Sequence, residues 1–305
     1  MPLQLVPPNT HFDFVKQRFW AFGVIALLFV ATLVSLAVHG LNYGIDFKGG
    51  IVIEARAANG ALDTSAVRSQ LETLNLGDIE LQEFGNTHDT VLIRIQRQEG
   101  DDAVQQQVAT NVRNLLGDNY EIRRTEVVGP RVGEELLHAG MLATLFAIVA
   151  ISIYVAFRFE WQFGAAALIG TLHDVIVTLG MFSIFKLDFN LTAIAALLTL
   201  AGYSINDTVV VFDRIRENLR RQKSGNLKAV INDAVNQTLS RTLMTAGITF
   251  MSLIPLVLFG GPSLLNFSLA LTWGVLLGTF SSIYVAASLL LYMKPLRQLG
   301  PVAAH

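Results

Sequence analysis

The sequence predicts a polytopic α-helical membrane protein, with six transmembrane helices and an α+β domain between the first and the second of them. Apolar residues make up 52% of the chain and charged residues only 15%, whereas soluble domains carry about 25% charged residues. The apolar residues gather in runs that reach the ~20 residues needed to cross a bilayer as a helix. One polar, periodically patterned segment, residues 40–135, interrupts these runs and is predicted to be a soluble domain.

The first apolar run covers residues 19–39 and follows a short segment, residues 1–18, that contains Lys16 and Arg18 near its end. A secretory signal peptide is an alternative, because "SLAVHG" offers small residues for cleavage. The run is longer than the apolar core of a signal peptide, which spans about 7–15 residues, and further apolar runs follow it. We therefore expect an uncleaved first transmembrane helix.

The segment 40–135 alternates between strand and helix patterns. Strands are expected where apolar and polar residues alternate, and helices where Asp, Ser or Thr precedes an amphipathic stretch. Strands are predicted at 49–57, 78–84, 90–96 and 120–129, helices at 63–75 and 101–117, and a turn at 85–89. The order β-α-β-β-α-β indicates a small ferredoxin-like sandwich.

Five further apolar runs are predicted as the remaining transmembrane helices, at 136–158, 163–185, 191–212, 241–260 and 266–293. A polar segment, 213–240, separates the fourth and fifth of these and is expected to form a helical loop. It holds the densest basic cluster of the chain, made of Arg214, Arg216, Arg220, Arg221, Lys223 and Lys228. Residues 294–305 form the tail.

Basic residues orient the protein, because short loops that carry Lys and Arg remain in the cytoplasm. Arg158 ends the second span, the basic cluster follows the fourth, and Lys294 and Arg297 follow the sixth. The opposite loops, 186–190 and 260–265, carry almost no positive charge. Six spans with both termini in the cytoplasm agree with the charge of every loop. They place the soluble domain on the other side of the membrane.

Several function classes are excluded by what the sequence lacks. There is no cysteine, which excludes disulfides, thiol catalysis and cysteine metal sites. No phosphate-binding loop, zinc-protease motif, nucleophile elbow or dinucleotide fingerprint is present. We therefore expect no enzyme activity, no catalytic residue, no cofactor, no metal and no nucleic-acid partner. Any energy that the chain uses should come from the membrane gradient or from a partner.

Asp207 is the first candidate functional residue, because it lies inside an otherwise apolar span where an ionisable group is costly. Ser204 and Tyr203 lie three and four residues before it and share its helix face. Asn206 is its direct neighbour and counts with Ser204 among the supporting polar residues.

Arg241 is the second candidate, at the edge of the fifth span. Thr245, Thr249 and Ser252 continue its helix face, so a basic polar stripe and the acidic stripe of Asp207 lie on consecutive helices. In a bundle the two stripes could meet.

Two interpretations of this pair remain balanced on the residues alone. Burial disfavours a charged carboxylate while a nearby arginine favours it, so Asp207 could change its protonation when its hydration or its distance from Arg241 changes. Alternatively, the two residues form a static ion pair, or Arg241 extends its head group toward the membrane surface.

His173 and Asp174 form a second polar spot, in the third span. They could extend a proton relay, since histidine titrates near neutral pH, or they could fix helix packing through hydrogen bonds. We favour the packing role for His173 and leave Asp174 open.

Five motifs together resemble the SecF proteins of the SecD/SecF family, which belongs to the resistance-nodulation-division (RND) superfamily. They are "NYGIDFKGG" at 42–50, "LHDVIVTLG" at 172–180, "LAGYSINDTVVVFDRIREN" at 200–218, "NQTLSRT" at 236–242 and "GVLLGTFSSIY" at 274–284. They occur in order over nearly the whole chain. The resemblance implies a bacterial inner-membrane subunit of the Sec protein-export machinery, with its soluble domain in the periplasm.

The resemblance also implies partners and residue roles. The partners are SecD, the SecYEG channel, YajC and the exported polypeptide, and the energy source is the proton-motive force. The proton-pathway aspartate and arginine of the family match Asp207 and Arg241. Asp46, Gly49 and Gly50 belong to a family signature with a structural role, in which the glycines permit the turn from the first span to the first strand. Anionic membrane lipid, or a partner, is expected to face the basic cluster.

Two rival functions lead to different expectations. One half of a proton-driven small-molecule efflux transporter of the same superfamily would need large porter domains that enclose a ligand, and the compact segment 40–135 argues against this. An assembly scaffold would tolerate the loss of Asp207.

Overall fold

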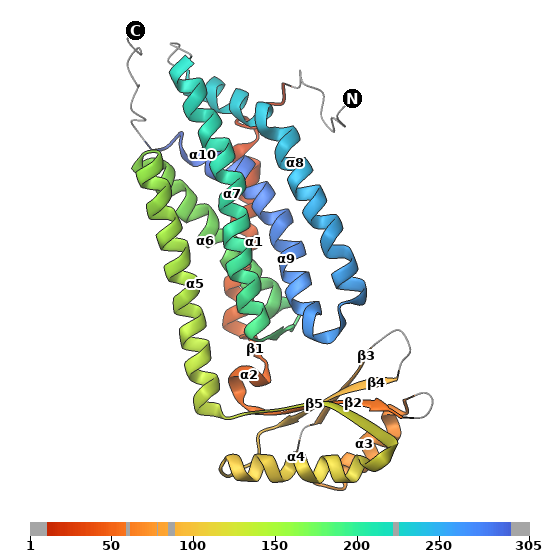
Figure 1. Ribbon diagram of the computed structural model, residues 1–305. Helices are drawn as coiled ribbons and strands as arrows, with labels where there is room; N and C mark the ends of the chain where they lie inside the picture. The colour runs from red at the N-terminus through yellow and green to blue at the C-terminus, as the bar shows by residue number, and fades with distance from the viewer. Residues whose placement is uncertain (1–10, 59–61, 78, 85–88, 222–225, 294–305) are drawn as a thin grey trace.

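Six long helices form most of the molecule, as the computed structural model shows for residues 11–58, 62–77, 79–84, 89–221 and 226–293 (Figure 1). They are α1 (Arg18–Val38), α5 (Pro130–Arg158), α6 (Trp161–Ile184), α7 (Leu191–Arg221), α8 (Leu227–Phe259) and α9 (Gly261–Ser281), the last continued by a π-helical turn (Ser282–Ala286) and α10 (Ala287–Leu289). All six are long and apolar enough to cross a membrane. The predicted set of six spans is confirmed. The predicted segments 1–10 and 294–305 lie outside the described residues.

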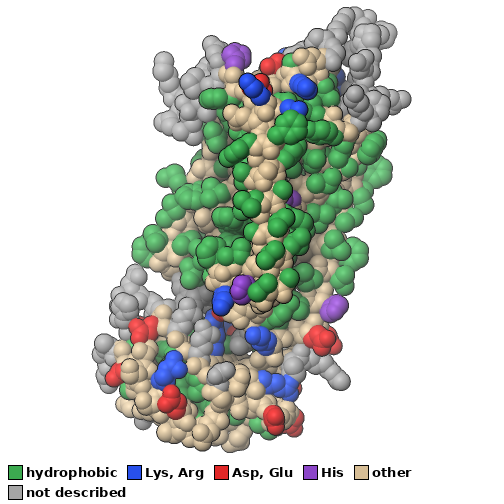
Figure 2. Space-filling model, turned by 180° about the vertical axis from the view of Figure 1, so that it is seen from behind, with side chains coloured by type: hydrophobic (Ala, Val, Ile, Leu, Met, Phe, Trp, Pro, Cys, Tyr) green, Lys and Arg blue, Asp and Glu red, His purple; other side chains and the backbone are tan. Residues whose placement is uncertain are grey.

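The six helices divide into an inner and an outer set. In α6, α7 and α9, between 56% and 67% of the apolar window is buried inside the protein, against 11% to 22% in α1, α5 and α8. Hydrophobic side chains cover the outside of the helices, and the charged side chains visible in this view gather at the two ends (Figure 2). This distribution suits a bundle surrounded by lipid, in which polar groups belong to the inner helices.

The polar segment 213–240 is not a separate element. The structure continues α7 to Arg221 and begins α8 at Leu227, so the segment consists of the ends of two long helices. The continuation has a local cause, because Glu217 pairs with Arg214 at 2.5 Å and with Arg221 at 2.6 Å along one face of α7. Lys223, which belongs to the expected basic cluster, lies outside the described residues.

A four-stranded antiparallel sheet lies at one end of the helical bundle. Its strands are β2 (Gly50–Ala57), β3 (Ile79–Phe84), β4 (Thr90–Gln96) and β5 (Tyr120–Val128), in the order β3-β4-β2-β5. Helices α3 (Thr64–Glu72) and α4 (Asp102–Leu116) pack on the face that points away from the bundle (Figure 1). Asp63 and Asp101 cap the two helices. Each element lies close to its predicted segment, while the expected turn at 85–89 falls almost entirely outside the described residues.

A small junction joins the sheet to the bundle. Strand β1 (Asn42–Tyr43) pairs in parallel with β6 (Asp188–Phe189), which connects α6 to α7. Helix α2 (Ile45–Lys48) follows β1 and leads into β2 through Gly49 and Gly50, whose φ angles are +76° and +146°. Side chains rarely tolerate these angles, so the backbone requires glycine there. The junction was not predicted, since two-residue strands carry no periodic signal.

Candidate functional site

Two carboxylates lie buried within the inner helices. Asp174 on α6 is 0% exposed and Asp207 on α7 is 2% exposed. Burying an ionisable group inside a span requires compensation from partners or a function that needs the group. The two residues differ in how far their oxygens are hydrogen-bonded.

Asp174 is held by three donors from three helices. Ser204 of α7 and Ser281 of α9 both donate to its Oδ2 at 2.6 Å, and the Nδ1 of His173 lies 3.1 Å from its Oδ1. Distances of 2.5–2.7 Å are typical of a hydroxyl that donates to an ionised carboxylate. Asp174 therefore ties α6, α7 and α9 together at the centre of the bundle.

His173 completes this network on its outer side. Its ring stacks on Phe29 of α1 with the centroids 6.4 Å apart. Its Nδ1 faces Asp174, while its Nε2 is buried and has no hydrogen-bond partner among the described residues. The arrangement is consistent with the packing role favoured above, because it links α1 to the inner helices.

Asp207 is held much more weakly. Thr245 of α8 donates to its Oδ1 at 3.4 Å, which is the long limit of a hydrogen bond. Its Oδ2 is buried and has no hydrogen-bond partner in the part of the chain that the structure describes. A buried oxygen without a partner carries a desolvation cost of about 1–3 kcal/mol, more for a charged group. The site thus favours a state in which this oxygen gains a proton or another partner.

Other polar atoms surround Asp207 without satisfying it. The hydroxyl of Tyr203, one helical turn before Asp207 on α7, lies beside the hydroxyls of Thr245, Thr249 and Thr279. The hydroxyl of Thr242 on α8 is buried and has no hydrogen-bond partner within the described residues. The sequence indicated Tyr203 only as a neighbour of Asp207 and did not indicate Thr242, although residues three apart, such as Thr242 and Thr245, share one face of a helix.

Arg241 does not pair with Asp207. It is exposed on α8 in this single chain, and no ion pair within 4.0 Å joins the two residues in the described structure. Arg241 lies one helical turn before Thr245, on the helix that packs against α7. Asn206 is exposed as well, so it is directed away from Asp207. Of the predicted residues, the structure therefore brings Thr245 to Asp207 and brings Ser204 and His173 to Asp174.

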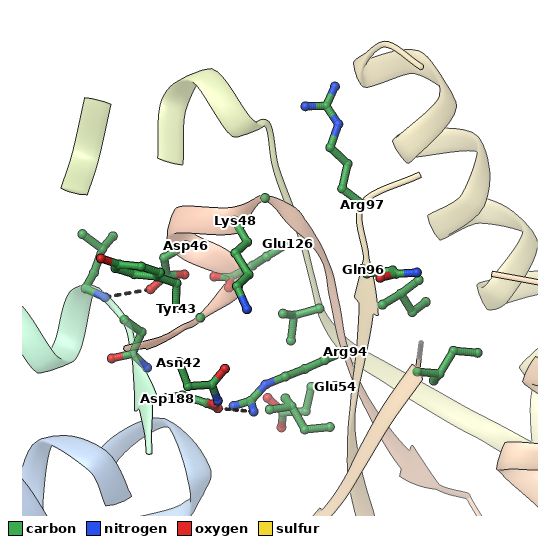
Figure 3. A pocket seen from close by; sticks show the side chains of 18 of the residues that line it. Asn42, Tyr43, Asp46, Lys48, Glu54, Arg94, Gln96, Arg97, Glu126 and Asp188 are labelled. Atoms are coloured by element: carbon green, nitrogen blue, oxygen red, sulfur yellow. Dashed lines mark hydrogen bonds and ion pairs between the residues drawn. The ribbon is translucent and has the colours of Figure 1, made fainter. Parts of the chain in front are cut away.

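Asp46 lies far from both carboxylates, at the junction with the sheet. Its Oδ2 accepts a hydrogen bond from the backbone N–H of Leu191 at 2.9 Å, so it caps the first residue of α7. Beside it, Arg94 of β4 pairs with Asp188 of β6 at 2.5 Å. Both contacts border a cleft of about 960 Å³ between the sheet and the bundle (Figure 3). Sequence reasoning did not single out Arg94 or Asp188.

Within the described residues, no group of three or more His, Asp or Glu side chains is arranged to hold a metal ion. The chemistry available inside the bundle is therefore that of carboxylates, hydroxyls, one histidine and one nearby arginine.

Comparison with known proteins identifies close relatives. Residues 107–295 match the family described as protein export membrane protein SecD/SecF, C-terminal, and residues 34–61 match the SecD/SecF GG motif. The protein translocase subunit SecF of Magnetococcus marinus is 47% identical over 298 residues, covering 96% of this chain and 95% of that protein. SecF of Rickettsia typhi is 42% identical over 291 residues, covering 95% and 94%.

The chain is also similar to part of longer proteins. The protein translocase subunit SecDF of Brucella abortus is 44% identical over 296 residues, and the match covers 96% of this chain but 39% of that protein. The crystal structure of SecDF, a translocon-associated membrane protein from Thermus thermophilus, matches with a TM-score of 0.81 and 33% identity. A SecDF structure in a super-membrane-facing form matches with a TM-score of 0.69 and 34% identity. Both structural matches cover 95% of this chain and 39% of the other.

Proposed function

The chain belongs to the SecD/SecF family of protein-export membrane proteins, and on this premise we propose that it uses the proton-motive force to promote late steps of polypeptide export. Its relatives are named as translocase subunits, so the chain is a transport component and not an enzyme. In the proposal it works with SecD, delivers its effect to polypeptides that cross the SecYEG channel, and associates with YajC. Asp207 takes up and releases the proton, and the charge of Arg241 influences how readily Asp207 does so.

One observation carries the proposal for Asp207. Its buried Oδ2 has no partner within the described residues and its Oδ1 has one long hydrogen bond, whereas Asp174 accepts three donors. A carboxylate in a low-dielectric site gains a proton easily when nothing stabilises its charge. Arg241 lies on the neighbouring helix without being paired to Asp207. A modest movement of α8 against α7 would therefore change which protonation state of Asp207 is favoured.

The exposed polar groups support SecD as the direct partner. Asn206 and Arg241 are exposed in this single chain although they lie in apolar helices. Polar groups at membrane depth almost always face protein or a water-filled cavity. We assign the face of α7 and α8 that carries them to the contact with SecD, which relatives such as SecDF carry in the same chain.

The proposed orientation places the protein in the bacterial inner membrane with both termini in the cytoplasm and the sheet domain in the periplasm. Basic residues near the beginning of α1, at the end of α7 and at the beginning of α8 support it, because they share the end of the bundle opposite the sheet (Figure 1). The strand order β3-β4-β2-β5 with two helices on one face supports a ferredoxin-like domain. Anionic lipid is the proposed neighbour of the basic end.

The test compares export with and without a proton gradient. Asp207→Asn keeps size and hydrogen bonding but removes titration, so we expect the gradient-dependent part of export to be lost while gradient-independent export remains. The measurement is translocation of a preprotein into membrane vesicles that contain the full complex. Full gradient dependence in this variant would refute the proton-carrier role and would favour a scaffold.

Two substitutions of Arg241 distinguish the effect of its charge from the effect of its hydrogen-bond geometry. Arg241→Lys keeps the charge but loses the planar fork of donors, and Arg241→Met loses both. We expect Lys to retain part of the gradient dependence and Met to lose it. Equal, full activity of both variants would remove Arg241 from the proposal.

A further inference from the structure

The junction between the sheet domain and the bundle connects the soluble domain to the helix that carries Asp207. Asp207 lies on α7, and the first residue of α7, Leu191, lies at the junction. Whatever moves α7 along its axis therefore acts on the junction. Two carboxylates there, Asp46 and Asp188, join α7 to the sheet.

Asp46 caps α7 from a distant part of the chain. Its Oδ2 accepts from the N–H of Leu191 at 2.9 Å, while the adjacent Asn190 accepts from the N–H of Ala193 at 3.0 Å. The first N–H groups of a helix have no partner within the helix, and a carboxylate there is stabilised by the helix dipole. Asp46 lies on α2, which leads directly into the central strand β2.

Asp188 forms the second connection, directly before α7. Its Oδ1 accepts from Asn42 at 2.8 Å, its Oδ2 pairs with Arg94 at 2.5 Å, and its backbone oxygen accepts from Asn266 of α9 at 3.0 Å. The side chains of Arg94 and Asp188 are 17% and 21% exposed, so solvent screens their pairing less than it screens a surface pair. Figure 3 shows the two side chains pointing toward each other across the cleft.

The cleft of about 960 Å³ leaves space beside these contacts. It is lined by five basic side chains, Arg94 among them, and by four acidic ones, which include Asp46 and Asp188. Because both charges are present in similar number, the cleft selects no ligand of one sign.

The solved relatives agree with this chain to different degrees. Two SecDF structures each cover 95% of the chain, at 33% and 34% identity, with TM-scores of 0.81 and 0.69. The backbone of this chain therefore superposes less well on one of these relatives than on the other.

We propose that Asp46 and Asp188 are positioning residues that make the sheet domain follow the displacement of α7. Asp46 bonds the first residue of α7 and lies on α2, which continues into β2. Asp188 lies just before α7 and pairs with Arg94 of the neighbouring strand β4. This inference rests on the proposed function, because it supplies the path by which protonation at Asp207 reaches the soluble domain.

The first experiment removes and restores the connection between Arg94 and Asp188. Because the chain has no cysteine, Arg94→Cys with Asp188→Cys gives its only thiols, which a cleavable bis-methanethiosulfonate reagent can join. We expect the gradient-dependent part of export to fall in the unjoined variant, to return on crosslinking and to fall again when a reductant cleaves the link. Equal export in the joined and unjoined states, or further loss on joining, would overturn the proposal.

The second experiment compares two helix caps of the same chemistry. Asp63 accepts from the N–H groups of Ser65 and Ala66 at 3.0 Å and caps α3 within the soluble domain, away from α7. Losing such a cap lowers the equilibrium constant for forming the helix end by a factor of about three to ten. Asp46→Ala should therefore lower gradient-dependent export by a similar factor. Asp63→Ala should destabilise the domain without changing the ratio of export with and without a gradient. Asp46→Asn keeps an acceptor and should restore most of the loss.

Asp207→Asn in the same assay distinguishes the two proposals. If Asp207→Asn keeps full gradient dependence, the proposed function fails and this inference with it. If Asp207→Asn loses the gradient dependence while Asp46→Ala, matched to Asp63→Ala, keeps it, the coupling through the junction alone is refuted.

Discussion

Asp174 and Asp207 occupy equally buried positions on neighbouring helices, but their surroundings are opposite. Asp174 accepts hydrogen bonds from Ser204, Ser281 and His173, whereas Asp207 accepts one long bond from Thr245 and has one oxygen without a partner in the described residues. A carboxylate with hydrogen bonds to both oxygens is a fixed anchor, since it joins the helices that supply those bonds. A carboxylate that lacks partners is free to change its state. Burial alone therefore does not distinguish the two carboxylates, whereas their hydrogen bonding does, and this difference is what supports Asp207 as the proposed proton site.

The largest effect is expected when the anchor is removed. Asp174→Ala removes the carboxylate that Ser204, Ser281 and His173 bond and opens a cavity, so the free energy of unfolding should fall by about 3 kcal/mol. The measurement is thermal unfolding of the purified protein in detergent. An unchanged melting temperature would mean that the network does not stabilise the bundle.

The sharpest comparison replaces each carboxylate by its amide. Asp174→Asn keeps one acceptor oxygen but places an NH₂ group opposite a donor, which should cost about 1–2 kcal/mol. Asp207→Asn should cost no more than about 0.5 kcal/mol, because a neutral amide is cheaper to bury than a carboxylate without partners. Both variants are measured by thermal unfolding. Equal destabilisation of the two would remove the distinction between anchor and proton site.

Each serine that holds Asp174 contributes a smaller share. Ser281→Ala or Ser204→Ala should lower the free energy of unfolding by about 0.6–1.7 kcal/mol, which are the average and the maximum measured for hydrogen bonds between membrane helices. Ser268 on α9 is a matched control, because its hydroxyl donates to Leu264 of the same helix. If Ser268→Ala were as destabilising as Ser281→Ala, the bond to Asp174 would have no special weight.

The smallest effect is expected at the single bond of Asp207. Thr245→Val preserves shape and removes the hydroxyl that lies 3.4 Å from Asp207. Because the bond is long, the free energy of unfolding should change by less than about 0.5 kcal/mol. Thr249→Val, whose hydroxyl donates to the backbone oxygen of Thr245 and not to Asp207 in the described structure, is the control. A loss above 1 kcal/mol, as an order of magnitude for a good hydrogen bond, would show that Asp207 is anchored after all.

Local features of the fold were predictable from the sequence. Span length and strand alternation are properties of neighbouring residues, which is why six spans and the β-α-β-β-α-β order could be derived. Segment 213–240 was expected to be helical, but its first part was not expected to continue the fourth span without a break, as α7 does to Arg221, because continuity depends on pairs along the helix such as Arg214 with Glu217.

The candidate site was predictable only in part. An aspartate inside a span draws attention by its cost, so Asp207 and Asp174 could both be singled out. Their difference depends on Ser281, which lies 107 residues from Asp174 in the sequence, and on the packing of α6 against α7 and α9. Helical periodicity determines which face a residue occupies but not which helix that face meets. The pairing of Arg94 with Asp188 was inaccessible for the same reason.

The parallel pairing of β1 with β6 has a consequence for the order of events during biosynthesis. Asn42 bonds to Asp188, a residue synthesised 146 positions later. The sheet is complete once β5 has been made, and domains generally fold as units in the order in which they emerge. The sheet domain is thus expected to fold before residues 188–191, which join it to the bundle, have been synthesised. A nascent chain halted before Asp188 would carry a folded sheet domain without its contacts to β6. Synthesis of the next few residues would allow these contacts to form.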